Sequence, residues 1–307
     1  MCRVPYCGCF SQRKGIVKRI FLFIVTNLAV LALLSVVIFV LEQGFGVRLG
    51  PGGAGGMLVF AAVFGFGGAL ISLALSKWTA KRLMGVRILG APQTEEESWL
   101  VGAIARLAAH ARIAVPEIGI FDTEEMNAFA TGARRNAALV AVSTGLLRGM
   151  PRAQAEAVLG HEISHVASGD MVTLALLQGV LNTFVIFLAR IIGTLVDRSV
   201  FRNDRAESGM GFYVATMLAQ IVLGIFASLI VCAYSRRREF RADRGGADLA
   251  GTASMVGALE TLKRSQGAPL PPQMQAFGIN TGTAGGWTLR FMSHPSLDDR
   301  IAALHPR

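Results

Sequence analysis

The chain has 307 residues, of which 52% are hydrophobic and 16% are charged, and its mean hydropathy is +0.50. Soluble domains carry about 25% charged residues, so this composition excludes a disordered protein, a collagen-like fibre and an ordinary soluble enzyme. The formal net charge of +10 would favour nucleic-acid binding in a soluble protein. In a chain with long apolar runs, orientation across a membrane explains the excess of Lys and Arg. The sequence therefore predicts a polytopic membrane protein with no nucleic-acid partner.

Four segments are apolar enough to span a bilayer, which takes about 20 residues. They cover residues 20–41, 57–76, 171–196 and 210–234. Lys and Arg gather before the first segment, after the second and after the fourth, whereas the link between the first two carries only Arg48. Because cytoplasmic loops are rich in Lys and Arg, both termini and residues 77–170 are expected in the cytoplasm. Whether the last two segments cross fully or form a re-entrant hairpin stays open.

The remaining segments predict two helices and three short strands. A capping box, Thr94 with Glu97, opens a helix over residues 92–112 in which apolar residues recur at helical spacing. Strand-like runs follow at residues 117–121, 127–131 and 137–143, separated by polar or Gly-containing turns. They predict a small antiparallel sheet, whose edge beside a cleft can accept an extended peptide. Pro151 suits the first turn of a second helix that runs to about residue 168.

A His-Glu-x-x-His motif occupies residues 161–165 and holds two of the chain's five histidines. In the predicted helix His161 and His165 lie one above the other on one face, so both imidazoles can bind one zinc ion. Glu162 lies about 100° round the helix, a position that suits a base acting on water activated by the metal. The alternative is a solvated helix face with chance spacing.

A catalytic zinc site takes three protein ligands and keeps one open position. Glu239 is the best third candidate, because the motif helix ends just before the third apolar segment and Glu239 follows just after the fourth. Two crossings would return the chain to the face that it left. Asp243, one helical turn on, can accept a hydrogen bond from a ligating histidine. The alternative is that Glu239 only balances Arg236 to Arg238 at a membrane surface.

A polar turn near the C-terminus supplies two further candidates, His294 and Arg300. Both are residue types that can stabilise negative charge on a tetrahedral intermediate. A capped helix start explains the same residues equally well.

Together these motifs resemble the HtpX family of membrane-bound zinc metalloproteases, which is related to the prenyl-protein CAAX endopeptidases. The resemblance covers almost the whole chain, in family order: two spans, Asn-Ala-Phe-Ala-Thr-Gly at 127–132, the motif helix, Gly-Asp at 169–170, two more spans, and the motifs at 238–243 and 293–295.

The family resemblance implies roles for individual residues. It matches His161, His165 and Glu239 to ligands of one zinc ion per chain, and Glu162 to the general base. It also matches Asp243 to an aspartate that supports the site, and Asn127 to an asparagine on the edge strand that borders the cleft. His294 and Arg300 match positions near the active site.

The expected fold class is mainly α, a polytopic membrane protein with four transmembrane helices and a cytoplasmic zincin-like α+β metalloprotease domain that contains the small antiparallel sheet. The expected parts are a basic cytoplasmic N-terminus (1–19), a transmembrane hairpin (20–76), a protease part with the His-Glu-x-x-His helix (77–170), a second transmembrane hairpin (171–234), and a protease part with the third ligand and a flexible loop at 267–290 (235–307).

The expected function is a zinc-dependent endopeptidase of the inner membrane, which hydrolyses misfolded or damaged membrane proteins at the cytoplasmic face. A protease that cuts within the bilayer would need its motif helix inside a span, whereas residues 151–156 before the motif are polar. A zinc-stabilised scaffold or sensor would have no use for Glu162, and a transporter would need ionisable groups at the midplane, which only Arg190 approaches. Natural substrates, cleavage specificity, oligomeric state, regulation and the roles of Cys2, Cys7 and Cys9 stay open.

Overall fold

The computed structural model describes residues 53–202, 209–265 and 294–305. The predicted span at 20–41, the N-terminal segment with its three cysteines and the loop predicted at 267–290 lie outside the described residues. Two compact units divide the chain, residues 1–66 with 180–224 and residues 67–179 with 225–307.

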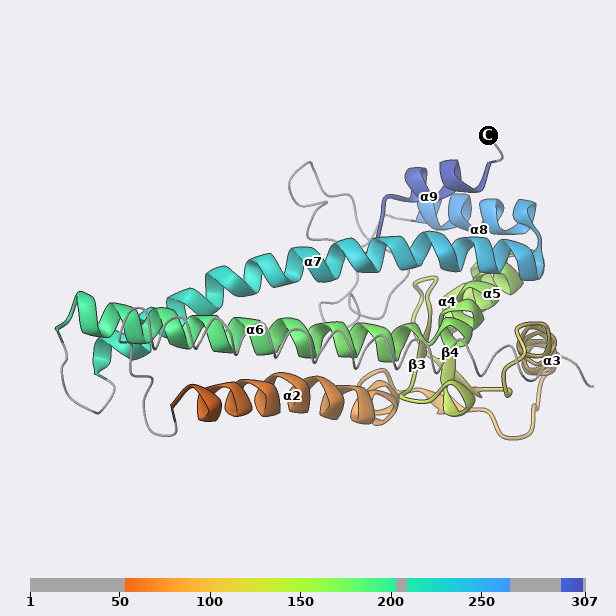
Figure 1. Ribbon diagram of the computed structural model, residues 1–307. Helices are drawn as coiled ribbons and strands as arrows, with labels where there is room; N and C mark the ends of the chain where they lie inside the picture. The colour runs from red at the N-terminus through yellow and green to blue at the C-terminus, as the bar shows by residue number, and fades with distance from the viewer. Residues whose placement is uncertain (1–52, 203–208, 266–293, 306–307) are drawn as a thin grey trace, which may run out of the picture. The chain divides into compact units, whose positions relative to one another are not determined.

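Three helices are long and apolar enough to cross a membrane. They are α2 (Gly53–Leu83), α6 (Asp170–Ser199) and α7 (Met210–Ala250) (Figure 1). Their mean hydropathies reach 2.3, 2.0 and 2.3. Bulky apolar side chains along α2 and α7, Phe64, Ile71 and Phe226 among them, are exposed, as expected of surfaces that lipid covers. The three predicted spans that fall on described residues are therefore confirmed as helices of membrane-spanning length and composition.

Polar groups in the first unit have partners that suit an apolar setting. The guanidinium of Arg190 in α6 lies 4.0 Å from the ring centroid of Phe60, a cation–π contact. Asp197 accepts hydrogen bonds from the backbone N–H groups of Gly209 and Phe212, at 3.0 and 3.1 Å. Its carboxylate therefore satisfies donors at the beginning of α7.

The sheet has four strands in the order β1-β2-β4-β3. These are β1 (Arg87–Ile88), β2 (Glu117–Phe121), β3 (Ala128–Thr131) and β4 (Leu139–Ser143). β2 and β4 pair in parallel, whereas the β1–β2 and β3–β4 pairs are antiparallel. The predicted antiparallel sheet is therefore wrong in the central pair, and β1 was not predicted.

β4 lies inside the sheet, between β2 and β3. All five of its residues are buried, which is typical of a strand covered on both faces, but all four residues of β3 are buried as well, so burial alone does not set the strand order. β3 is left at the edge of the sheet in the part of the chain that the structure describes. Turn lengths between the three runs permit either order, so local sequence could not decide between a meander and this mixed sheet.

Helices cover both faces of the sheet. On one face α3 (Glu95–His110) and α5 (Arg152–Ser168) share a core with Val140 and Val142 of β4. On the other face the end of α2 packs against the sheet through Ala80, which contacts a cluster that includes Phe121 and Phe129. The remaining helical elements are a 3₁₀ turn (Arg135–Ala137), α4 (Thr144–Gly149), α8 (Thr252–Ser265) and α9 (Leu297–Leu304).

Local sequence signals set the two helices that the sequence predicts in this unit. The Thr94 side chain accepts a hydrogen bond from the backbone N–H of Glu97 at 3.1 Å, the predicted N-cap of α3. Pro151 directly precedes α5, and Gly169 ends it in the left-handed conformation with φ 66°. That sharp end turns the chain at once into α6 and places Asp170 five residues beyond His165.

Small residues let α5 and α7 approach closely. A Cβ on Gly160 would lie 3.3 Å from the Cα of Gly246, and a Cβ on Gly246 would lie 3.0 Å from the backbone N of His161. Larger side chains at this crossing would push the helices apart. The glycine contact therefore brings the charged end of α7 against the motif helix.

Candidate metal centre

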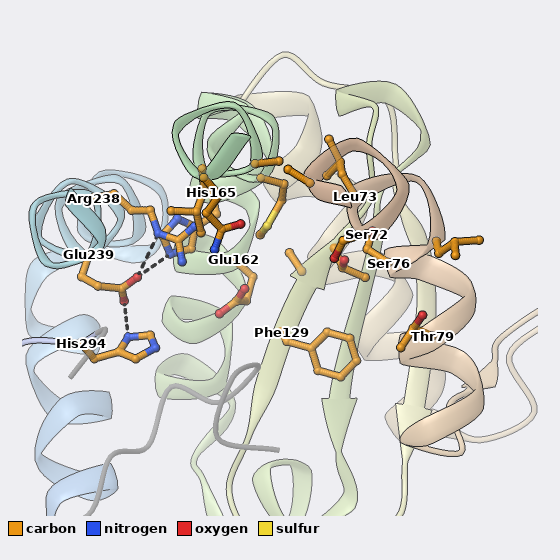
Figure 2. A pocket seen from close by; sticks show the side chains of 18 of the residues that line it. Ser72, Leu73, Ser76, Thr79, Phe129, Glu162, His165, Arg238, Glu239 and His294 are labelled. Carbon is orange, nitrogen blue, oxygen red and sulfur yellow. Dashed lines mark ion pairs between the residues drawn. The ribbon is translucent and has the colours of Figure 1, made fainter. Parts of the chain in front are cut away.

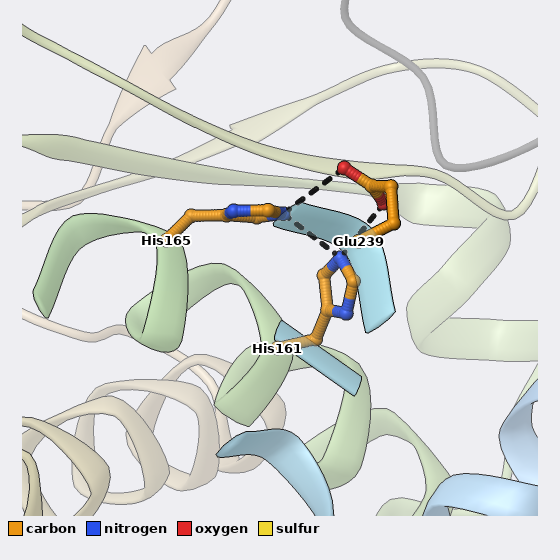
Figure 3. A group of neighbouring side chains, drawn as sticks. All are labelled: His161, His165 and Glu239. Atoms are coloured by element: carbon orange, nitrogen blue, oxygen red, sulfur yellow. Dashed lines mark hydrogen bonds and ion pairs between the residues drawn. The ribbon is translucent and has the colours of Figure 1, made fainter. Parts of the chain in front are cut away.

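The motif helix and α7 bring three ligand atoms together. His161 and His165 lie four residues apart on one face of α5, and their Nε2 atoms are 3.1 Å apart. Glu239 of α7 lies with Oε2 at 3.4 Å from His161 Nε2 and Oε1 at 3.4 Å from His165 Nε2. Figure 3 shows the three side chains converging from the two helices. All three are buried, and their ligand atoms form a group that can hold one metal ion.

The spacing of these atoms fits zinc. Two atoms at tetrahedral angles, each 2.0–2.2 Å from one ion, are roughly 3.3–3.6 Å apart, close to the three observed separations. Both carboxylate oxygens of Glu239 are buried, and neither makes a hydrogen bond of normal geometry with the described residues. A buried carboxylate of this kind is costly unless a cation compensates it. Two imidazoles and a carboxylate are also the donor set of catalytic zinc sites.

Carboxylates behind the histidines fix the direction of the imidazole rings. His161 Nδ1 lies 2.9 Å from Asp243 Oδ1, and His165 Nδ1 lies 2.8 Å from Asp170 Oδ2. With the Nδ1 protons held by carboxylates, the Nε2 lone pairs are free to face the metal. The sequence interpretation gave Asp243 this position but missed Asp170, although Gly-Asp at 169–170 was noted. The available signal was the glycine that ends α5 just before the aspartate.

The two supporting aspartates have cations of their own. Arg300 of α9 is fully buried and grips Asp243 with two hydrogen bonds, Nε to Oδ2 at 2.8 Å and Nη2 to Oδ1 at 2.6 Å. Arg241 Nη2 donates to Asp170 Oδ1 at 3.5 Å. Arg300 thus lies behind Asp243, and its Nη1 is 4.0 Å from Glu239 Oε2.

The electrostatics of the site favour a positive charge at its centre. Burial lowers the pKa of His161, but the carboxylates of Asp243 and Glu239 outweigh burial and raise the pKa to about 9. Burial likewise lowers the pKa of His165, and the carboxylates of Asp170 and Glu239 reverse the effect and raise it. Protons are drawn to both rings because negative charge is in excess there, and a divalent cation can take the place of those protons.

Glu162 lies beside this centre. It follows His161 on α5, is buried, and lines the same cavity as His161, His165 and Glu239. Burial raises the pKa of its carboxyl above the ordinary value of 4.5. A carboxylate with a raised pKa next to a metal centre is suited to exchange protons with water.

The cavity that contains the site has a volume of about 340 Å³ and mainly apolar walls. β3 forms one wall through Phe129, Ala130 and Thr131. Side chains of α2 and α6 form others, among them Ser72, Leu73, Ser76 and Thr79, and then Met171, Leu174 and Gln178. Figure 2 shows His165, Arg238, Glu239 and His294 on one side of the view and Phe129 with the α2 residues on the other. The edge strand therefore borders the space in front of Glu162.

The other predicted site residues occupy different surroundings. His294 lines the cavity, and its Nδ1 lies 2.9 Å from Glu239 Oε2. Asn127 directly precedes β3 and is fully buried. Its backbone N–H donates to Ser143 Oγ at 2.9 Å, and its carbonyl accepts from Ser143 N–H at 2.8 Å. Arg238, which the sequence interpretation treated only as a membrane-surface charge, also lines the cavity.

Comparisons with known proteins show the family of this chain. The family model of Peptidase family M48 matches residues 94–307. The chain is 57% identical over 293 residues to Protease HtpX of Alkalilimnicola ehrlichii, covering 94% of this chain and 97% of that protein. It is 55% identical to Protease HtpX homolog of Thiobacillus denitrificans, with coverages of 94% and 98%.

A solved structure shows the same fold at low sequence identity. The crystal structure of S. mikatae Ste24p matches with a TM-score of 0.58 and 18% identity, over 96% of this chain. The chain spans 66% of the length of that solved chain. The family match covers β2, β3, β4, the motif helix and Glu239, and this chain belongs to Peptidase family M48.

Proposed function

We propose that this protein is a membrane-bound zinc endopeptidase, which hydrolyses peptide bonds without a covalent intermediate. One observation carries the proposal. The Nε2 atoms of His161 and His165 and the carboxylate of Glu239 converge within 3.4 Å of one another, and Glu162 lines the cavity beside them. Membership of a peptidase family and relatives named as proteases support the same activity.

His161, His165 and Glu239 would hold one zinc ion per chain. Zinc would act there as a Lewis acid and lower the pKa of water towards neutrality. Asp243 and Asp170 would keep the two imidazoles in the ligating tautomer. Arg300 would act through Asp243, because its guanidinium donates two hydrogen bonds to that carboxylate and its side chain is not among those that line the cavity.

Glu162 would be the general base. It would take a proton from the attacking water and later deliver it to the leaving amine. Burial raises the pKa of its carboxyl, which makes the carboxylate a stronger base for the first of these steps. His294 would hold the outer side of Glu239, which its Nδ1 approaches to 2.9 Å.

The substrate would bind as an extended segment along β3. An edge strand offers backbone hydrogen bonds to an added strand, and Asn127 would anchor the beginning of that edge. The mainly apolar walls, built in part by helices of membrane-spanning composition, suit apolar segments of unfolded or misassembled membrane proteins. Lys81 and Arg82 in the last turn of α2 support placement of the site on the cytoplasmic face of the inner membrane.

The test is proteolysis of reduced, unfolded casein by the detergent-purified full-length chain. Wild type is compared with Glu162→Gln and with Glu156→Gln, a matched change on the same helix that only breaks an ion pair to Arg106. We expect wild type and Glu156→Gln to cleave, Glu162→Gln to be inactive, and chelated wild type to recover when zinc is added. Cleavage by Glu162→Gln at the wild-type rate would refute the role of the base.

The alternative is a zinc-stabilised scaffold or sensor without proteolytic activity. A scaffold has no use for a buried carboxylate beside the metal centre, and burial of Glu162 without a catalytic role only costs free energy. Zinc-loaded, folded protein that cleaves neither casein nor itself would favour this alternative.

A further inference from the structure

Arg238 has the features of a functional group that its membrane-surface position does not explain. Its side chain is 12% exposed, and its Nε and Nη1 atoms are buried without a hydrogen bond to any described residue. The neighbouring Arg237 is exposed, which is enough for a residue that only orients a helix in the membrane. Burying two of its three guanidinium nitrogens without hydrogen-bond partners costs free energy, and a bound ligand in the cavity would offset that cost.

The position of Arg238 on α7 mirrors that of Glu162 on α5. Each directly adjoins a metal-binding residue in sequence, and successive residues lie about 100° apart round a helix. Each therefore points beside the metal centre into the cavity, and both line it. Arg238 Nε lies 3.6 Å from Glu239 Oε1, and that oxygen lies 3.4 Å from His165 Nε2. The guanidinium thus contacts Glu239, which in turn contacts His165.

The other arginines next to the metal centre hydrogen-bond to aspartates and do not line the cavity. Arg300 holds Asp243 by two hydrogen bonds, and Arg241 holds Asp170 by one. Arg238 makes only the long ion pair with Glu239 within the described residues. Its charge reaches the base as well: burial raises the pKa of Glu162, and Arg238 is among the groups that oppose this rise.

We propose that Arg238 is a catalytic residue, whose guanidinium donates hydrogen bonds to the carbonyl oxygen of the scissile peptide bond as that oxygen becomes an anion. The inference rests on the proposed peptidase activity. The sequence alone suggested His294 and Arg300 for this task, but Arg300 holds Asp243 and does not line the cavity, although its Nη1 has no hydrogen-bond partner, and His294 Nδ1 faces Glu239. Arg238 lines the cavity with unused donors.

The step balances without a further reactant. The water oxygen bonds to the carbonyl carbon, the π electrons of the C=O bond move to oxygen, and the water proton passes to Glu162. The electron pair on the anionic oxygen then re-forms the C=O bond as the C–N bond breaks, the C–N electron pair stays on nitrogen, and Glu162 returns the proton to that nitrogen. Arg238 transfers no proton in these steps and stabilises the anionic oxygen as a hydrogen-bond donor.

The experiment compares Arg238→Gln with Arg237→Gln, which removes the same charge from the same run of arginines. The probes are a casein peptide that wild type cleaves and a phosphinic peptide of the same sequence, whose tetrahedral anion resembles the intermediate. Cleavage rate, zinc per chain and peptide affinity are measured, the affinities in Glu162→Gln protein so that the casein peptide survives. Arg238→Lys tests whether a positive charge without the planar, two-pronged guanidinium is enough for catalysis.

We expect Arg238→Gln to keep one zinc per chain and to lower kcat about 100-fold to 1,000-fold, the effect of losing one oxyanion donor. Affinity for the phosphinic peptide should fall by a similar factor, while affinity for the casein peptide changes less than about threefold. Arg237→Gln should match wild type, and Arg238→Lys should lie between wild type and Arg238→Gln.

Three results would overturn the proposal: a kcat for Arg238→Gln within about threefold of wild type, equal losses of affinity for both peptides, or a defect that added zinc repairs. If wild type cleaves no substrate, the proposed peptidase function fails first. In that case a phosphinic peptide with a casein sequence still tests Arg238. If wild type and Arg238→Gln bind it equally, or if neither binds it, Arg238 is not part of an oxyanion site.

Discussion

Replacing Asp170 by asparagine should weaken metal binding while leaving the fold intact. In the structure one carboxylate oxygen faces His165 Nδ1 at 2.8 Å, and the other accepts from Arg241 at 3.5 Å. Both neighbours are donors. An asparagine offers one oxygen and one NH₂ group, so either orientation turns a donor towards a donor. The variant therefore loses either the hydrogen bond to His165 Nδ1 or the hydrogen bond from Arg241.

The size of the effect follows from the role of such partners. Loss of a carboxylate behind a ligating histidine typically costs 10-fold to 100-fold in metal affinity, or about 1.4–2.7 kcal/mol. Asp170 lies at the first residue of α6 and touches the site only through His165 and Arg241, so we expect the full range for Asp170→Asn and at least its upper end for Asp170→Ala.

The assay is a competition titration of zinc between metal-free protein and a coloured chelator. Asp248→Asn serves as the control, because Asp248 is an exposed aspartate on α7. We expect the zinc Kd to rise for Asp170→Asn, to stay unchanged for Asp248→Asn, and helix content by circular dichroism to match wild type in both. Cleavage should return when zinc is supplied in excess. An Asp170→Asn protein that binds zinc as tightly as wild type would refute the assignment of Asp170 to His165.

Three further predictions test the packing and the base. Arg300→Leu should lower the free energy of unfolding by about 3–5 kcal/mol, because Asp243 stays buried without its cation, whereas Lys263→Leu, which breaks an exposed ion pair, should lower it by less than about 1 kcal/mol. Thermal unfolding in detergent measures both variants, and equal losses of stability would contradict the reasoning. Gly246→Val should cost about 1–3 kcal/mol and weaken zinc binding, because its side chain meets the backbone of α5; an unchanged zinc Kd would show that the helices can separate freely. Burial raises the pKa of Glu162, and the base acts deprotonated, so kcat/KM should fall as the pH is lowered through a pKa above 4.5; a rate that is constant down to pH 4.5 would contradict this.

Residue spacing and the order of apolar segments in the sequence predict much of the candidate site. The i, i+4 spacing of His161 and His165 dictates a shared helix face, and the structure brings their Nε2 atoms within 3.1 Å. Glu239 lies far away in sequence, but the lengths of the two intervening apolar segments already implied that the chain returns. The structure brings it to both histidines, with Asp243 one turn further on.

Other features depend on tertiary contacts that no local pattern encodes. The parallel pairing of β2 and β4 requires β3 to lie outside them, and the short turns allow this order as readily as a meander. Arg300 looked like a residue of the reaction centre, yet its guanidinium ends on Asp243. Arg238 looked like one of three equivalent surface charges, and only burial separates it from Arg237.

Zinc stoichiometry and casein cleavage, measured on the same samples of wild type, Glu239→Gln and Glu162→Gln, test the central claim most directly. The account predicts one zinc ion per chain and cleavage in wild type, one zinc ion without cleavage in Glu162→Gln, and neither in Glu239→Gln at limiting zinc. Folded Glu239→Gln protein that keeps one zinc ion per chain and cleaves casein as wild type does would contradict it, because the third ligand would then lie elsewhere.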